Sequence, residues 1–465
     1  MNKNAEGQNS TTVDASPVKS FFVNMLTRDI KLEDAILDLL DNCVDGILRS
    51  GSTKEGNEPY QGYYAHIKYD KNSFSIEDNC GGIPWSLHNY AFRMGRATNR
   101  PSESVNSVGV YGIGMKRAIF KIGRYCLIST RNEDHEYQVE INSEWLTSTD
   151  WNIPVKENTH ILKKNGTKIH IEDIYDGIKE SFGIDEISFT ANLYEMISTH
   201  YAFIIAKGFN VKINDKEIEA KPTKLIFMEE EIGIKPFIYK AKIEDVEIFL
   251  AVGFTRPLPS ENELDEEQNG PKYSSMDAGW TIVCNDRAVV YCDRTELTGW
   301  GESNVPRYHT QFIAISGIVE FRAKDATKLP TTTTKRGVDA SSRIYLQVKN
   351  KMREGMVMFT GYTNKWKKQP EETRKQMDKG KFYSLEEIKK EAINLKFQKT
   401  TNTPGEQYKP NLPMPENHTN RKAKISFARD REEVCEVAEY LFDDRYAEPS
   451  KVGEECYERI LRNIL

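Results

Sequence analysis

The stretch ILDLLDNCVDGI, residues 36–47, has the periodicity of a buried helix. Its apolar residues recur every three or four positions, and the positions beside that face are apolar too. Asp38, Asn42 and Asp45 lie at i, i+4 and i+7 and so form a single polar stripe. Burying two carboxylates and an amide is costly unless a partner satisfies them, so the stripe indicates a bound ligand. The alternative is an amphipathic helix with its polar face in solvent.

The composition is that of an ordinary globular protein. The 465 residues are 38% apolar and 29% charged, which predicts roughly three domains of about 150 residues each. The net charge of −6 means that any contact with nucleic acid must be local. The seven cysteines include no C-x-x-C pair, so neither a disulfide framework nor a zinc site is predicted, and we expect a cytoplasmic protein. No apolar run is long enough to predict a membrane span.

A second motif follows a predicted β-hairpin at residues 64–76. Its second strand runs into the sequence IEDNCGGIP, residues 76–84. A carboxylate at the strand end, Asp78, suits an exocyclic amine, and the glycines after it allow a flat ligand to approach closely. The alternative is a plain β-turn, because Asp, Asn and Gly are common turn residues.

The third motif, VGVYGIGMKRAIF at residues 108–120, follows a polar loop at 93–107. Three glycines precede a helical pattern with Lys116 in its first turn, which predicts an anion site made of backbone N–H groups and a cation. The motif is not a Walker A loop, because Met115 follows Gly114, and Arg117 stands where G-x-G-x-x-G needs its last glycine. The alternative is a glycine-rich loop used only for packing.

The remaining pattern predicts an α+β protein with several parts. We expect a flexible tail at 1–20, a first domain that carries the three motifs at 21–183, an α/β unit at 184–340, a basic helical region at 341–399, a linker at 400–420 and a small module of one strand and two helices at 421–465. Residues 341–399 hold fifteen Lys or Arg and seven Asp or Glu. Such a stretch suits the DNA backbone, but a solvated helix surface is the commoner outcome.

The order of these motifs resembles the GHKL ATPases, which include type II topoisomerases, MutL proteins, large heat-shock ATPase chaperones, MORC proteins and histidine kinases. The resemblance is strong over residues 30–172 and closest in wording to the MORC version. It is fainter over 185–340. It implies a Bergerat-type α/β sandwich that binds ATP and Mg²⁺, followed by a ribosomal-protein-like α/β transducer domain.

The resemblance also implies a role for individual residues. Asp38 would be the general base, and Lys335 would reach the γ-phosphate. Asn42 would coordinate Mg²⁺, and Asp78 would accept a hydrogen bond from adenine. The nucleotide-binding residues that it implies are Asn42, Asp45, Asp78, Gly82, Ile83, Gly109, Gly112, Gly114, Met115, Lys116 and Thr167.

Two residues depart from the family pattern. The general base is usually glutamate, and Asp38 is one methylene shorter, or roughly 1.5 Å of reach. Because a misplacement near 1 Å can cost about 10²-fold in rate, hydrolysis is expected to be slow. Cys80 replaces the first glycine of the turn after Asp78, and Gly81 beside it is expected to supply the backbone freedom.

Several functions fit this pattern. The leading prediction is an ATP-gated homodimeric clamp, in which residues 1–30 cross to the partner copy. The second is a nucleotide sensor with little turnover. A histidine kinase fits poorly, because only a short tail precedes the ATP-binding motifs. The client is open between DNA, through 341–399, and a partner protein, through 421–465, and a role in prokaryotic phage defence rests on analogy alone.

Overall fold

The computed structural model describes residues 18–51, 56, 58–93, 114–133, 135–259, 277–332, 335–366, 375, 377–401, 403–414, 425 and 427–464. These residues form two units, 1–413 and 414–465, which are described separately below. In the described part of the chain, no helix has the length and apolar character needed to cross a lipid bilayer.

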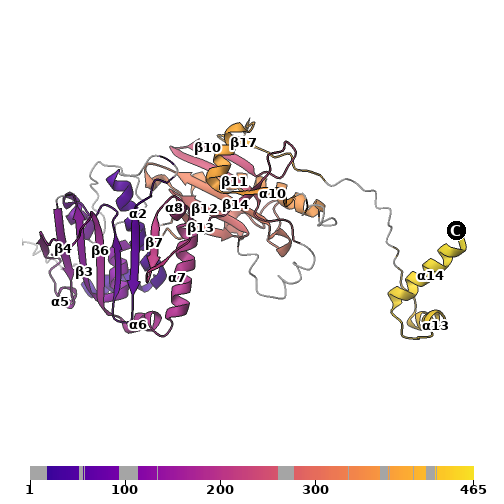
Figure 1. Ribbon diagram of the computed structural model, residues 1–465, viewed down its shortest axis with the longest axis horizontal. Coiled ribbons are helices and arrows are strands. Elements are labelled where there is room, and N and C mark those ends of the chain that lie inside the picture. Colours follow the sequence, from indigo (N-terminus) through magenta and orange to yellow (C-terminus); the bar gives the residue numbers. More distant parts are fainter. Residues whose placement is uncertain are drawn as a thin grey trace, which may run out of the picture. The chain divides into compact units, whose positions relative to one another are not determined.

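An eight-stranded sheet forms the first half of the larger unit (Figure 1). Its strand order is β5-β4-β3-β6-β2-β1-β7-β8. The strands are β1 (Tyr64–Tyr69), β2 (Phe74–Asp78), β3 (Gly123–Asn132), β4 (His135–Ile141), β5 (Val155–Glu157), β6 (Gly166–Ile174), β7 (Asn210–Ile213) and β8 (Lys216–Glu217). The hairpin predicted at 64–76 is present as β1 and β2, with Ile67 opposite Ile76.

Helices cover one face of this sheet, and a single apolar core lies between them and the strands. The helices of this half are α1 (Lys19–Arg28), α2 (Leu32–Ser50), α3 (His88–Phe92), α4 (Gly114–Ile122), α5 (Ser143–Thr147), α6 (Asp176–Phe182), α7 (Glu186–His200) and α8 (Ala202–Ala206). Helix α2 has a continuous buried side, as its periodicity predicts. Gly46 allows α2 to approach the turn after β2, since a Cβ there would lie 2.4 Å from the carbonyl oxygen of Cys80.

The first domain extends beyond the predicted boundary at residue 183. Strand β7 pairs in parallel with β1, with Tyr64 opposite Asn210, and α7 contributes Leu193 and Ile197 to the first core. Helix α1 begins at Lys19, inside the predicted tail. The Lys19 ammonium donates to the Trp145 carbonyl oxygen at 2.7 Å and lies 3.9 Å from the centre of that ring.

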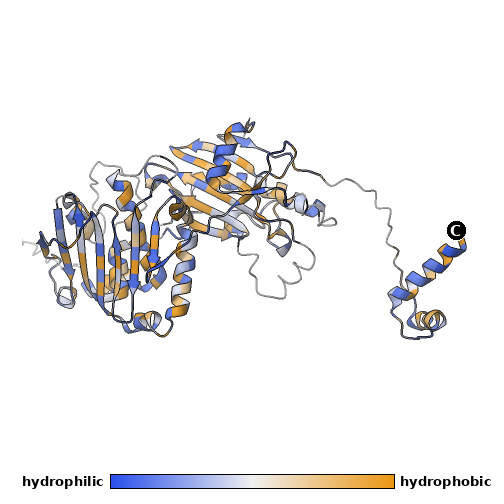
Figure 2. Ribbon diagram, in the orientation of Figure 1, coloured by the Kyte–Doolittle hydropathy of each residue, from blue (hydrophilic) through white to orange (hydrophobic). Residues whose placement is uncertain are grey.

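A seven-stranded sheet with the order β13-β12-β14-β11-β10-β17-β16 forms the second half of this unit. Its strands are β10 (Phe237–Ile243), β11 (Val246–Phe254), β12 (Gly279–Cys284), β13 (Arg287–Asp293), β14 (Ile315–Arg322), β16 (Gln398–Lys399) and β17 (Glu406–Tyr408), and β9 (Leu225–Phe227) pairs separately with β15 (Lys381–Tyr383). Figure 2 shows largely hydrophobic central strands here, whereas strands of the first sheet alternate. The central strands are accordingly buried along almost their whole length.

The predicted helical region and linker differ from the structure, because both contribute to this second domain. Helix α10 (Arg343–Trp366) buries Val348, Met352 and Met356 in the second core, and α12 (Leu385–Glu391) follows β15. Strand β17 lies inside the predicted linker at 400–420 and pairs with β10. Short 3-10 turns are Trp85–Leu87, Glu296–Thr298, Thr310–Phe312, Ala326–Lys328 and Ala392–Asn394.

The second unit has two helices among its described residues, α13 (Arg431–Phe442) and α14 (Pro449–Ile464). The strand predicted within 421–465 is absent from the described residues of that range. Ala438 and Val452 are the buried apolar residues described in this unit, so its own core is very small.

Candidate functional site

Helix α2 carries the polar stripe that the sequence singled out. Asp38 is 8% exposed and Asp45 is 7% exposed, whereas Asn42 between them is exposed to solvent. An exposed amide on a helix that is otherwise buried is accessible to a ligand. The first domain therefore presents Asn42 at its surface, with carboxylates beside it on the same stripe.

Asp78, at the end of β2, lies next to this helix. Its Oδ1 accepts hydrogen bonds from the backbone N–H of Cys80 at 2.7 Å and of Thr167 at 3.3 Å. Its Oδ2 lies 3.5 Å from Cys43 Sγ on α2, so the first and second motifs meet here. Desolvation raises the pKa of Asp78 to about 6, against the opposing effect of these donors.

The turn after Asp78 packs against β3 and β6. The backbone N–H of Ile83 donates to Thr130 Oγ1 at 2.8 Å, and Thr130 Oγ1 lies 3.2 Å from Thr167 Oγ1. Gly82 has φ +67°, and a Cβ there would lie 2.0 Å from the Arg131 carbonyl oxygen. Three predicted nucleotide-binding residues, Gly82, Ile83 and Thr167, are thus within one local network.

Replacing Gly82 with alanine is expected to destabilise the protein by about 2–4 kcal/mol, because a side chain would both strain the left-handed backbone and clash with β3. Urea unfolding measures the change. Gly177→Ala in α6 is the matched control, since nothing lies within 4 Å of a Cβ at that position. If both variants unfold at the wild-type urea concentration, the tight packing of this turn is contradicted.

Helix α4 begins beside Asp38. A Cβ on Gly114 would lie 3.5 Å from the Asp38 carboxylate, and Arg117 Nη2 lies 2.5 Å from Asp38 Oδ2. Met115 is half-buried. Lys116 is buried, and its ammonium donates to the Ala91 carbonyl oxygen of α3 at 2.6 Å.

The third motif, residues 108–120, is described by the structure only from Gly114 onward. Gly109 and Gly112 lie outside the described residues. Lys116, the predicted phosphate-binding lysine, is engaged with α3 in this structure.

Asp41, a residue the sequence reasoning missed, receives cations from the second domain. Its carboxylate accepts from Arg287 Nε at 3.0 Å, from Lys335 Nζ at 3.1 Å and from Tyr201 Oη at 2.5 Å. Burial opposes ionisation of Asp41, but Lys335 and Arg287 together lower its pKa well below the ordinary value. Lys335 of the second domain thus contacts α2 at Asp41, which is three residues after Asp38.

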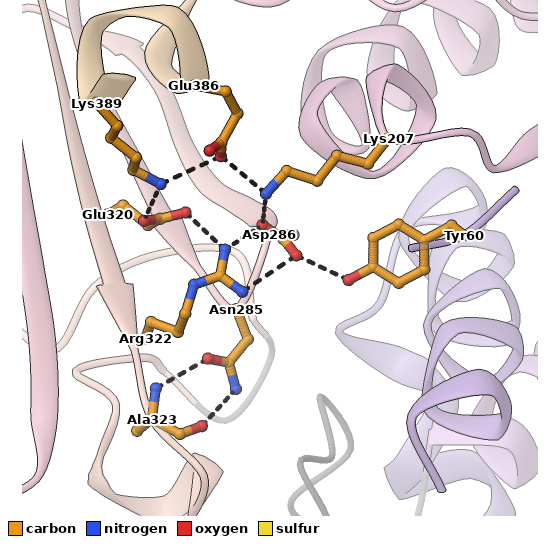
Figure 3. Close-up of polar contacts among 9 residues, drawn as sticks. All are labelled: Tyr60, Lys207, Asn285, Asp286, Glu320, Arg322, Ala323, Glu386 and Lys389. Carbon is orange, nitrogen blue, oxygen red and sulfur yellow. Dashed lines mark hydrogen bonds and ion pairs between the residues drawn. The ribbon is translucent and has the colours of Figure 1, made fainter. Parts of the chain in front are cut away.

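A second polar junction lies at Asp286, the residue before Arg287 in the chain (Figure 3). Asp286, in the turn between β12 and β13, accepts from Lys207 Nζ at 2.6 Å and from Tyr60 Oη at 2.8 Å, both in the first domain. Arg322 Nη2 of β14 donates to the same carboxylate at 2.6 Å. Asp286 in the turn and Arg287 at the start of β13 therefore join the second domain to the first.

These partners carry little local signal in the sequence. Asn285 and Asp286 both have positive φ, as a two-residue hairpin turn requires, so the dipeptide between apolar runs signals the turn. The partners in the first domain lie 79 to 246 residues away in the chain, and local sequence patterns do not predict contacts over that separation.

A comparison with protein families bears on the first domain. Residues 30–181 match the family model of histidine kinase-, DNA gyrase B- and HSP90-like ATPases. This stretch of the chain is therefore similar to a GHKL-type ATPase domain. The matched range runs from α2 to α6 and contains all three motifs, whereas Lys335 lies outside it. A search of curated proteins found no match to the chain.

The match supports nucleotide binding in the first domain. Among the described residues, no group of three His, Cys, Asp or Glu side chains could hold a metal ion by itself. The structure places Asp38 of α2 beside the first turn of α4 and places Asp78 beside Cys43 of α2. Lys335 pairs with Asp41, which also belongs to α2.

Proposed function

We propose that this protein binds ATP with Mg²⁺, hydrolyses it slowly, and uses ATP to close two copies of the chain into a clamp. The observation that supports this most is the ion pair between Lys335 and Asp41. Asp41 is three residues from Asp38 on α2, so Lys335 of the second domain lies close to the proposed nucleotide site. It can therefore couple the state of that site to the second domain. The matched GHKL-type domain supplies the nucleotide site itself.

Asp78 would recognise the adenine. Its Oδ1 accepts from two backbone donors, and its Oδ2, which accepts from the Cys43 thiol, has a second lone pair for the exocyclic amine. Gly82 and Ile83 would lie along the ring, with Thr167 supporting Asp78 through its backbone N–H. Asp45, buried one turn after Asn42, would hold water at the base side of the site.

Asn42 fits a magnesium ligand, because it is an exposed amide oxygen donor on a stripe with two carboxylates, and Mg²⁺ prefers oxygen. The ion would neutralise charge on the phosphates. Gly114, Met115 and the N-terminus of α4 would bind the phosphates, together with Lys116 once it leaves Ala91, and Gly109 and Gly112 belong to the same proposal.

In the proposed reaction, Asp38 accepts a proton from the water that attacks the γ-phosphorus. The bond to the β–γ bridging oxygen breaks, and the products are ADP and phosphate. Lys335 would transfer from Asp41 to the γ-phosphate and stabilise its charge. The second candidate function, a nucleotide sensor with little turnover, is favoured by the Asp38 side chain, which is one methylene shorter than the usual glutamate.

Light scattering with a non-hydrolysable ATP analogue tests the clamp. We expect the mass of the wild-type protein to double when analogue and magnesium are both present, because the nucleotide orders the site that joins the two copies. Asn42→Ala is expected to stay at its starting mass. A wild-type mass that the analogue leaves unchanged would contradict the clamp.

The proposed client is DNA or a partner protein. Three cations of α10, Lys349, Lys351 and Arg353, already pair with Glu302 or Glu354, which reduces the free positive charge of the basic stretch. An electrophoretic shift with duplex DNA at two salt concentrations, with and without ATP, separates the two clients.

Affinity for ATP is expected to weaken as the pH falls below about 6, the pKa to which burial raises Asp78. Protonation removes the charged acceptor for the adenine amine, a loss of about tenfold or more. Calorimetric titrations between acidic and neutral pH measure this. Asp78→Asn is the control. The phosphates of ATP titrate in the same way in both experiments, so a difference between the two pH profiles reports the Asp78 carboxyl group. Parallel pH profiles for the two proteins would rule out this role of Asp78.

A further inference from the structure

Arg117 holds the carboxylate of Asp38 from a different helix. The guanidinium Nη2 lies 2.5 Å and Nε lies 3.2 Å from the same oxygen, Asp38 Oδ2. The two side chains are 16% and 9% exposed, so the pair is largely shielded from water. Charge-assisted hydrogen bonds of this kind fix geometry as well as charge. The orientation of Asp38 therefore depends on α4 as well as on its own helix.

Both donors use one oxygen. Within the described part of the chain, Asp38 Oδ1 has no hydrogen bond, whereas Oδ2 has two. A general base needs one free oxygen within reach of the proton that it accepts. The pair thus leaves Asp38 with a fixed orientation and with Oδ1 available.

The charges around Asp38 come from three elements. Burial raises its pKa most strongly, and Asp41 on the same helix adds to this effect. Arg117 of α4 and Lys335 of the second domain lower it, Arg117 more than Lys335. Loss of Arg117 would therefore favour the protonated carboxyl, which cannot act as a base.

We propose that Arg117 is a positioning residue for ATP hydrolysis, which keeps Asp38 ionised and directs its Oδ1 to the attacking water. The inference rests on the proposed function. It also offers a reason why the shorter aspartate can serve here, because the carboxylate is held by the same helix whose first turn, at Gly114, would bind the phosphates. Neither the Walker A loop nor the G-x-G-x-x-G pattern includes an arginine at the position of Arg117.

The test is phosphate release by the full chain across pH, in wild type, Arg117→Met and Arg117→Lys. We expect Arg117→Met to be at least about tenfold slower at neutral pH and the acidic limb of its profile to move upward by about one pH unit. Arg117→Lys should restore part of both. Affinity for ATP should stay within about threefold of wild type, since the residue acts on the chemical step.

Arg124→Met is the matched control. Arg124 forms an exposed ion pair with Asp173 on the first sheet, and its loss should leave the profile unchanged. Thermal unfolding of every variant identifies misfolding, and Arg117→Lys then carries the test if Arg117→Met is unfolded. An unchanged rate and profile in Arg117→Met would overturn the proposal, and so would a faster rate, which would make Arg117 a brake.

A readout without nucleotide separates this inference from the proposed function. In protein labelled with ¹³C at aspartate, the carboxyl resonance that is absent from Asp38→Asn belongs to Asp38. Its titration midpoint should move to higher pH in Arg117→Met, and an unchanged midpoint overturns the inference. If the wild type does not bind ATP, the proposed function fails while this measurement still decides what Arg117 does to Asp38.

Discussion

Replacing Asp41 with alanine is expected to lower the free energy of unfolding by about 3–5 kcal/mol, because it leaves buried cations without their counterion. Arg287 is 1% exposed and Asp41 is 2% exposed, so water cannot replace the lost carboxylate. Lys335 and the Tyr201 hydroxyl lose the same acceptor. Urea unfolding followed by tryptophan fluorescence measures the change.

The control for this prediction is Asp215→Ala, which removes an exposed ion pair with Lys68 and should not shift the midpoint. The pH dependence has a definite sign. Because the pKa of Asp41 is lowered in the folded protein, its contribution is present above the unfolded value of about 4 and is lost as the pH falls further. The free energies of unfolding of the wild type and Asp41→Ala should therefore converge in acid. A midpoint for Asp41→Ala no lower than that of the control would contradict this account of the domain junction.

Asp38→Ala is expected to reduce phosphate release by about 10²–10⁴-fold while ATP still binds, because the variant loses the general base and keeps the residues proposed for adenine and magnesium. Phosphate release at saturating ATP measures the rate, and calorimetry measures binding. Asp38→Asn keeps the shape of the side chain and an oxygen that can accept from Arg117, but it cannot act as a base. An equal loss of rate in Asp38→Asn and Asp38→Ala therefore assigns the loss to the missing base.

Asp38→Glu adds a test of reach. If the shorter side chain limits the reaction, glutamate should raise the rate above that of wild type, as the family pattern implies. Normal turnover by Asp38→Ala would contradict the general-base role.

Local sequence patterns predict the elements that carry the proposed nucleotide site. The spacing of Asp38, Asn42 and Asp45 predicts one face of α2, and the runs on either side of residues 70–72 predict the β1–β2 hairpin. Three glycines before an apolar period predict the start of α4, and Gly114 is its first residue. Each of these signals lies within about twenty residues, where helix and strand periods act directly.

Long-range pairings explain what the sequence did not predict. Strand β7 joins β1 across a separation of well over a hundred residues, and β17 completes a sheet from within a stretch rich in Pro, Asn and Thr. The contact of Arg287 with Asp41 depends on how two domains meet, which no periodicity encodes. The glycine motif predicts a phosphate contact for Lys116, whereas its hydrogen bond to the Ala91 carbonyl oxygen depends on the position of α3.

The central claim is that a magnesium-bound adenine nucleotide occupies the site between α2 and the first turn of α4. Calorimetric titration of the full chain with ATP, with and without magnesium, tests it most directly, with Asp78→Ala as the matched variant. We predict saturable binding by the wild type, weaker binding without magnesium and strongly reduced binding by Asp78→Ala. The absence of any binding heat from the wild type with ATP and magnesium would contradict the claim.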